Sequence, residues 1–378
     1  MSSAVAVSIR DRRPAGLLLA VAMLGLMCVL SLAIGTESVG LSTVWQAVTD
    51  YTDSGDQWIV HDLRIPRTVL GIVVGIALGL SGALIQGLTR NPLADSQILG
   101  IDAVAGLFVV AAIAFLHMSS LLTYVWFAFL GAAVAMVLVY LVGTAGRAVV
   151  TPVRMLLAGV AVGAVADGVS FTIRLQNPRA FDSMRFWDAG ALDGRGLDAV
   201  WVVTPFIVVG AVLCFYVSRG LNAIALGDDL AVAMGGNMVR TRTLGLIAVT
   251  LLAGAATAAA GPIGFVGLMV PHAVRWFTGP DWRWICAFCV IAGPALLLAA
   301  DIVGRVVVSP GELPAGIVTA GGAVEHFGMP VDPGNLLLLA RLDGRPVLGL
   351  PGCCRSPKLN GFDWVLERLA AGIEVERG

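Results

Sequence analysis

Lysine is almost absent from this sequence, and its absence excludes one kind of nucleotide site. Lys358 is the only lysine among 378 residues, and Ser356-Pro357 precedes it instead of a glycine-rich turn. A phosphate-binding loop of the G-x-x-x-x-G-K-[ST] type needs its lysine to contact the phosphates of a nucleotide. No such loop can exist here. If this chain is part of an ATP-driven pump, ATP is hydrolysed on another polypeptide.

Charged residues are also scarce. They make up 13% of the chain, and hydrophobic residues make up 58%, whereas about 25% of the residues of a soluble domain are charged. This composition indicates a membrane protein. The net charge of −1 and the lack of a basic run give no indication of a nucleic-acid partner. The six cysteines are scattered without the spacing of a zinc or redox site, so we expect no metal and no cofactor.

The apolar runs predict an all-α polytopic membrane protein with about nine transmembrane helices. About 20 apolar residues cross the hydrocarbon core as a helix. Arg10, Arg12 and Arg13 precede the first run, which is longer than the apolar part of a typical signal peptide. We therefore expect the N-terminus in the cytoplasm. The expected spans are 15–35, 68–89, 103–116, 121–146, 155–173, 199–218, two within 243–274, and 284–300.

Small residues recur at every fourth position of the second span, where they form one ridge that lets another helix approach closely. The ridge either packs against a neighbouring helix or lines a translocation path, and the sequence favours neither. Asn91-Pro92 follows the span and should stop the helix, because proline lacks an N–H and restrains the residue before it. The ridge residues are Gly71, Gly75, Gly79, Ala83 and Gly87.

The polar residues around this glycine ridge resemble those of the FecCD-type permeases, the membrane subunits of ABC importers for iron-siderophore, haem and vitamin B12. The resemblance implies a multi-pass protein of the bacterial inner membrane. Its implied partners are two ATP-binding subunits that hydrolyse ATP, an external substrate-binding protein, and a second permease copy or a homologue. The matching residues are Arg64-x-Pro66-Arg67, Ser81-Gly82-Ala83 with Gln86, Asn91-Pro92-Leu93-Ala94-Asp95, Leu99-Gly100 and Trp187-x-x-Gly190-x-Leu192.

Two arginines stand at the outer end of the second span, against the positive-inside tendency. In the resembling family the arginines that match Arg64 and Arg67 receive acidic residues of the binding protein, and guanidinium groups suit carboxylates. Snorkelling to lipid headgroups is the alternative. Arg305 matches a third docking arginine of the family. It also lies four residues after Asp301, so a local ion pair is the simpler interpretation.

The polar stretch 219–242 is predicted to form two short helices on the inner membrane surface. Asn222 could cap a helix, and Asp228-Asp229 favours a helix start. The stretch matches the family's coupling segment, which fits a groove on the ATPase, although an ordinary amphipathic surface loop would also explain it. The matching coupling residues are Leu226, Gly227, Asp228, Asp229, Ala231 and Gly235.

Glycine and proline are dense in a second family motif, which begins at Gly261. Irregular backbone is tolerated in a membrane only where protein or water satisfies it, so we expect the pathway centre here. His272 could be a pH-sensitive contact, but a hydrogen-bonded structural histidine is the simpler interpretation. The residues expected along the path are Gly71, Gly75, Gly79, Gln86, Asn91, Pro92, Gly261, Pro262, Gly264, Phe265, Gly267, Pro271 and His272.

The family resemblance stops near Thr319, where a tenth span is expected. Residues 320–378 instead resemble a fragment of a molybdopterin-binding domain, with Gly328-Met329-Pro330 and Gly349-Leu350-Pro351-Gly352 as its clearest pieces. We therefore expect a permease domain over 1–319 and a small α/β-like fragment over 320–378. About fifty residues is too little of that domain to bury a core and fold alone.

Two other functions are compatible with parts of the sequence. A secondary transporter driven by protons could use Asp102, Asp167 or Asp301 as relay carboxylates. A fusion with a role in molybdenum-cofactor chemistry would explain the C-terminal fragment. The permease interpretation explains more of the chain than either alternative, and it assigns no catalytic residue.

Overall fold

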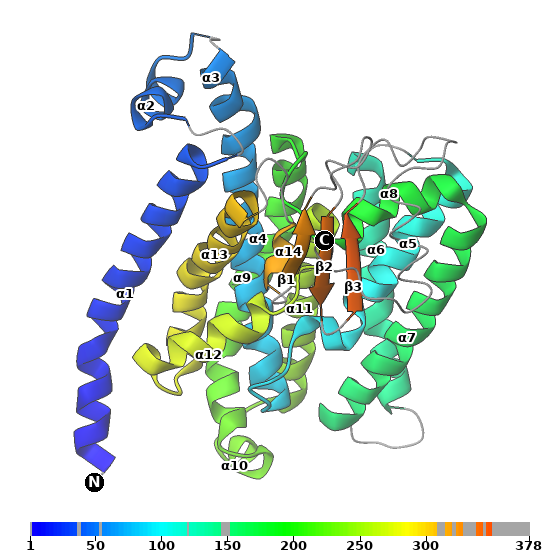
Figure 1. Ribbon diagram of the computed structural model, residues 1–378. Helices are drawn as coiled ribbons and strands as arrows, with labels where there is room; N and C mark the ends of the chain where they lie inside the picture. Colours follow the sequence, from blue (N-terminus) through cyan, green and yellow to red (C-terminus); the bar gives the residue numbers. More distant parts are fainter. Residues whose placement is uncertain are drawn as a thin grey trace.

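The computed structural model describes residues 2–35, 39–52, 55–118, 121–144, 152–307, 314–319, 323–327, 338–342 and 345–349. Within them the permease part is a bundle of helices (Figure 1). Seven helices in this part are long and apolar enough to cross a membrane. Nine spans were expected. Two of the expected spans are too short to cross a membrane as a single helix. They are α5 (Ile101–Leu116), with 16 residues, and α12 (Val266–Thr278), with 13 residues.

Helix α4 (Ile65–Thr89) forms the centre of the larger group of helices. It packs against α9 (Leu197–Ala225), α11 (Met238–Ala260), α12 and α13 (Trp282–Val307). In α4, 78% of the apolar stretch is buried, whereas in α1 (Ser2–Ala33) only 11% is buried. Helix α1 lies along the outside of this group (Figure 1). The second span is thus the element around which the others pack.

A second group consists of α5, α6 (Leu121–Thr144) and α7 (Pro152–Gln176), which pack on one another. The short turn η2 (Ser96–Leu99) connects α4 to α5, and α8 (Pro178–Asp188) follows α7. Asn177 caps α8 by accepting a hydrogen bond from the Ala180 N–H, and Pro178 occupies the first helical position. Sequence signals at this helix start thus match the structure.

The outer loop after α1 holds more structure than expected. It contains α2 (Leu41–Thr49) and α3 (Gly55–Trp58), and a π-helical turn, η1 (Ile59–Arg64), joins α3 directly to α4. The second span therefore starts well before Thr68. At its other end α4 stops at Thr89, two residues before Asn91-Pro92, as predicted, and Arg90 adopts a left-handed conformation.

The stretch 219–242 contains one short helix, not two. It is α10 (Asp228–Ala233), and the residues before and after it extend α9 and begin α11. Asn222 does not cap a helix as expected. It lies within α9, donates from Nδ2 to Asp281 Oδ1 at 2.8 Å and accepts from the Trp282 N–H at 2.9 Å. Asn222 thereby holds α9 against the start of α13.

After α13 the described chain gives only α14 (Ala315–Thr319) where a tenth span was expected. Three strands follow, β1 (Ala323–Phe327), β2 (Leu338–Leu342) and β3 (Arg345–Gly349). They form an antiparallel sheet in the order β1-β2-β3, with Val324 opposite Ala340 and Ala340 opposite Val347. The glycine-rich pieces of the expected fragment, 328–330 and 350–352, lie outside the described residues.

Candidate functional site

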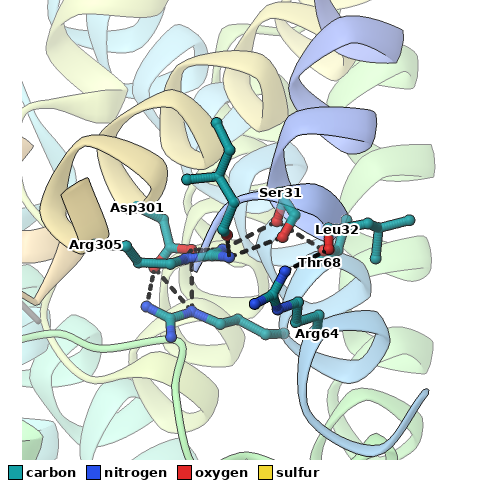
Figure 2. Close-up of polar contacts among 8 residues, drawn as sticks. Ser31, Leu32, Arg64, Thr68, Asp301 and Arg305 are labelled. Atoms are coloured by element: carbon teal, nitrogen blue, oxygen red, sulfur yellow. Dashed lines mark hydrogen bonds and ion pairs between the residues drawn. The ribbon is translucent and has the colours of Figure 1, made fainter. Parts of the chain in front are cut away.

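The three arginines predicted to dock a binding protein meet at one end of the bundle. Arg64 is the last residue of η1 and Arg67 lies in the first turn of α4, whereas Arg305 lies near the end of α13. Figure 2 shows Arg64 with Arg305 and Asp301. These arginines are 5%, 9% and 1% exposed, so little of each side chain is open to an incoming protein. Their guanidinium groups bind protein atoms, which also argues against snorkelling to headgroups. We call these three residues with Asp301 the arginine cluster.

One carboxylate serves two of these arginines. Arg67 donates from Nε and Nη2 to Asp301, at 3.0 Å to Oδ2 and 2.7 Å to Oδ1 respectively. Arg305 donates to Asp301 Oδ2 from Nε at 3.0 Å and also from Nη2. The predicted local pair between Asp301 and Arg305 is confirmed, and the link to Arg67, 234 residues away in sequence, is additional.

Other N–H groups of Arg64 and Arg305 bind the end of α1. Arg64 donates to the carbonyl oxygens of Leu32 and Ala33, both at 2.8 Å, and Arg305 donates to those of Ser31 and Ile34 at 2.8 and 2.9 Å. The last carbonyls of a helix lack partners within it and carry partial negative charge. The arginine cluster therefore fastens α1 to α4 and α13 (Figure 2).

A hollow of about 420 Å³ adjoins the arginine cluster. Arg195, from the connection between α8 and α9, also lines it and donates from Nη1 to the Tyr124 hydroxyl at 3.2 Å. The hollow and the adjoining Asp301 together contain four arginines and three carboxylates, those of Asp62, Asp193 and Asp301. The formal net charge of this group is therefore +1. The hollow thus suits an anionic group. Sequence reasoning missed Arg195, although it lies just after the Trp187-to-Leu192 motif. The lining residues are Gly35, Ile59, Asp62, Leu63, Arg64, Arg67, Asp193, Gly194, Arg195, Gly196 and Arg305.

The break predicted at Gly261-Pro262 is confirmed. Helix α11 ends at Ala260, and the chain is not helical again until Val266. Two loops pack on this non-helical segment: the Ala191 N–H donates to the Ala260 carbonyl at 2.9 Å, and Asp95 accepts from the Phe265 N–H at 3.1 Å. Protein groups therefore satisfy irregular backbone, as a membrane environment requires.

Asp95 is buried where the α4–α5 connection reaches the broken helix. Its Oδ1 accepts from the Ser96 N–H at 2.6 Å, and its Oδ2 accepts from the Phe265 N–H. Burial raises the pKa of the Asp95 carboxyl, and these hydrogen bonds oppose the rise. Asp95 was noted only as part of a family motif, and its contact with Phe265 could not be read from spacing.

Gln86 joins α4 to α12. Its Nε2 donates to the carbonyl oxygens of Gly267 and Leu268, both at 3.2 Å, while its Oε1 accepts from Arg275 Nη2 at 3.3 Å. Gly267 also lies against Gly82, where an added Cβ would come 2.0 Å from the Gly267 carbonyl oxygen. These contacts place two residues of the predicted path, Gln86 and Gly267, inside the packed core.

The glycine ridge of α4 packs against neighbouring helices. A Cβ added at Gly75 would lie 2.5 Å from Pro294 Cα, and one at Gly79 would lie 2.9 Å from the Cys289 carbonyl oxygen, both on α13. Gly71 meets Leu298 of the same helix, and Gly87 meets Leu221 of α9. The packing interpretation is therefore the one that the contacts support in this conformation, and a pathway role for these glycines stays a prediction.

The other predicted path residues are divided between core and surface. Gly264 faces Gln97, and Pro271 is buried. Phe265 is 42% exposed, with a left-handed φ of 67°. Pro92 and His272 are exposed, Asn91 is half-buried, and Pro262 is partly buried. No hydrogen bond joins His272 to another described residue, so the expectation of a hydrogen-bonded structural histidine is wrong.

The predicted coupling residues protrude at the end of the bundle opposite the arginine cluster (Figure 1). Gly227 and Gly235 turn the chain with φ values of 115° and 79°, as only glycine does readily. Ala231 is fully buried against the bundle. Leu226, Leu230, Val232 and Met234 are 50–62% exposed and give α10 an apolar outer surface, with Asp229 exposed beside them.

The three carboxylates proposed for a proton relay differ in their direct contacts. Asp301 is held by two arginines, Asp102 accepts a hydrogen bond from Thr257 Oγ1 at 2.5 Å, and Asp167 is exposed on α7. No hydrogen bond connects one of the three to another within the described ranges. The geometry gives no support to the relay.

Comparisons with known proteins agree with this architecture. The model of the FecCD transport family matches residues 23–324. The chain is 46% identical over 320 residues to the ferric enterobactin transport system permease protein FepD of Escherichia coli, covering 85% of this chain and 94% of FepD. It is 37% identical over 301 residues to the siderophore transport system permease protein YfiZ of Bacillus subtilis, covering 80% and 89%.

A solved structure has the same fold. It is a metal-chelate type ABC transporter in an inward-facing conformation, with a TM-score of 0.71 at 24% sequence identity. The match covers 82% of this chain and 95% of that one. The family match ends at residue 324, near Thr319, where the sequence resemblance was expected to stop. The β1–β3 region beyond Val324 lies outside it.

Proposed function

The chain belongs to the FecCD transport family and is a multi-pass permease subunit of an ABC importer of the inner membrane, and from this premise we propose that it imports a ferric siderophore. Its relatives FepD and YfiZ are named for siderophore transport, and haem or cobalamin chelates are the alternatives that the wider family offers. The observation that carries the proposal is the near-full-length similarity to FepD.

We propose that a substrate-binding protein docks over the hollow beside the arginine cluster. Arg64, Arg67 and Arg305 would receive acidic side chains there, and Arg195 adds a fourth guanidinium to the same wall. Because the arginines are already bound to Asp301 and to α1, an incoming carboxylate would share them with these partners. Charge-assisted hydrogen bonds to carboxylates are strong enough to make such a contact specific.

At the other end, two ATP-binding subunits would hydrolyse ATP and couple it to transport through α10. The apolar outer surface of α10 is the kind of projection that a groove on another subunit would cover, because such a patch is otherwise costly in water. Gly227 and Gly235 set its direction. Leu226, Asp228, Asp229 and Ala231 complete the coupling segment.

A second permease copy or a homologue would complete the transporter, with substrate passing between the two subunits. Pro92, Phe265 and His272 are predicted path residues that are already exposed in this conformation. The buried ones, such as Gln86 and Gly267, would support the broken helix from behind.

We propose that residues 320–378 are a separate fragment that resembles part of a molybdopterin-binding domain and that does not fold independently. The small antiparallel sheet β1–β3 is compatible with the α/β-like character expected of it. A cofactor role for this fragment has no support beyond the sequence resemblance.

The experiment that tests the permease proposal is co-purification with its ATP-binding subunit. The tagged chain is expressed with the ATPase encoded beside it and extracted in detergent, and the amount of ATPase retained is measured. We expect a complex, and we expect Asp229→Arg in α10 to reduce retention at least tenfold by reversing a charge in the contact.

Asp198→Arg is the matched control, because Asp198 is an equally exposed aspartate at the start of α9, away from α10. It should leave the complex intact. Equal retention by both variants would contradict coupling through α10. Failure of the intact chain to bind any ATPase, with binding restored when an ordinary tenth span replaces residues 320–378, would show that the altered C-terminus has disabled the permease.

A further inference from the structure

Helix α7 carries one formal charge within its membrane-spanning part. From Met155 to Ile173 the chain is apolar or small except for Asp167 and two hydroxyl residues, Ser170 and Thr172. Asp167 lies nine residues before the end of α7 at Gln176, about 14 Å along the helix axis. It is therefore well inside the span rather than at its end.

Asp167 points away from the helices that α7 packs on. The packed face of α7 contains Ala166 and Ser170, each 3% exposed, and meets α5 and α6. Asp167 and Gly168 lie on the exposed face, and no atom comes within 4 Å of a Cβ added at Gly168. The carboxylate therefore faces open space outside the single subunit.

No hydrogen bond or ion pair to another described residue holds the charge of Asp167 directly. Arg174, two turns further along the same helix, attracts the Asp167 carboxylate at a distance. Its direct contacts go to Asp188, with Nη2 at 3.2 Å from Oδ1 and a second, shorter contact from Nη1. A carboxylate facing lipid at this depth is costly, and such residues face a water-filled cavity or a protein interior instead.

We propose that Asp167 faces the aqueous substrate passage and gives it a negative charge that favours cationic or neutral chelates over polyanionic ones. The proposal rests on the proposed function, because it is the permease role that supplies a passage. If two copies of the chain face each other across it, two carboxylates contribute. Opposite charges attract and like charges repel within a few ångströms even in water, so charge selection would operate inside the membrane domain itself.

The test uses cysteine labelling of the permease–ATPase complex and needs no identified cargo. Gly168→Cys places a thiol beside Asp167, where the structure leaves room for a side chain. A cationic and an anionic methanethiosulfonate reagent are applied to membrane vesicles, and the rates at residue 168 are read by mass spectrometry of the α7 peptide. No native cysteine lies in α7, so the signal is unambiguous.

We expect both reagents to label residue 168, the cationic one faster. Adding Asp167→Asn should lower the cationic-to-anionic rate ratio about three- to tenfold, because one nearby charge has been removed. Adding Asp198→Asn, the same chemical change outside the span, should leave the ratio unchanged. Leu18→Cys on the exposed face of α1 serves as the lipid-facing reference and should stay unlabelled.

Lack of labelling at residue 168 in a complex that retains its ATPase would overturn the proposal, since the face would then contact lipid or a tightly packed partner. A ratio that Asp167→Asn does not change would overturn the charge selection. If Gly168→Cys prevents assembly, the labelling rates can be measured at Ala164→Cys, which lies on the same exposed face. Loss of ATPase binding by the unmodified chain would instead count against the proposed function.

Discussion

Asp301 and Asp167 are two aspartates in apolar spans, and their surroundings differ completely. Asp301 is fully buried, is bound by Arg67 and Arg305, and lies in a cluster that also holds the end of α1. Asp167 is exposed, and within the described residues no hydrogen bond or ion pair holds it. The first carboxylate contributes to folding, because its removal would leave two buried guanidinium groups without their anion. The second contributes nothing visible to folding, which is why we assign it to function.

The largest loss of stability should come from Asp301→Asn. The substitution keeps the shape of the side chain but removes the charge that compensates two buried arginines, and breaking a buried ion pair costs about 3–5 kcal/mol. The free energy of unfolding in mixed micelles should fall by this amount. Asp198→Asn at an exposed site is the control. If the two variants are equally stable, the arginine cluster is not a structural centre.

The second largest loss of stability should come from Gly75→Val. Its Cβ would lie 2.5 Å from Pro294 Cα, and a backbone atom cannot move aside as a side chain can. We expect a loss of about 3 kcal/mol, the upper end of the range for overpacking. Gly168→Val on α7 is the matched control, since a Cβ there meets nothing within 4 Å. Comparable losses from both would mean that the α7 face is packed as tightly as the α4 ridge.

Thr257→Val should have an intermediate effect. It removes the hydroxyl that hydrogen-bonds Asp102 and leaves a carboxylate inside the bundle with one partner fewer, which costs about 1–3 kcal/mol. Thr172→Val tests the same change on the exposed face of α7, where the hydroxyl binds only the Gly168 carbonyl of its own helix. Unfolding in mixed micelles should separate the two, and an unchanged stability of Thr257→Val would show that Asp102 has other sufficient partners.

Asp167→Asn should change stability least. Because no hydrogen bond or ion pair within the described residues is lost, the free energy of unfolding should stay within about 0.5 kcal/mol of the wild-type value. Uptake into vesicles that contain the whole importer should nevertheless shift, with a lower ratio of cationic to polyanionic ferric chelate. A large loss of stability would place Asp167 in the same class as Asp301 and remove the contrast between them.

Local features of the fold could be predicted from the sequence. The end of α4 before Asn91-Pro92 and the break after Ala260 follow from proline and glycine chemistry, which acts within a few residues. The pairing of Asp301 with Arg305 follows from helical spacing. The gathering of Arg64, Arg67 and Arg305 was expected from family resemblance alone.

Features that depend on distant parts of the chain could not be predicted. The bond from Arg67 to Asp301 joins residues 234 apart, and the burial of all three arginines depends on how α1 is placed. Asn222 has the side chain of a cap, but tertiary contacts with the start of α13 use it instead. The glycines of α7 look alike in sequence, but Gly159 packs against the backbone of η2 whereas a Cβ at Gly168 would meet nothing within 4 Å, and only the fold separates them.

The contact between α1 and Arg305 also sets an order of events during synthesis. The two ends of that contact are separated by 274 residues, and ribosomes add about 5–20 residues per second. The first span must therefore wait tens of seconds in the bilayer before α13 arrives to hold its outer end. Helix α1 can do so because it is apolar on nearly every side, with only 11% of its span buried in the finished protein. A polar substitution on its lipid face should thus lower the yield of inserted protein more than the stability of protein already assembled.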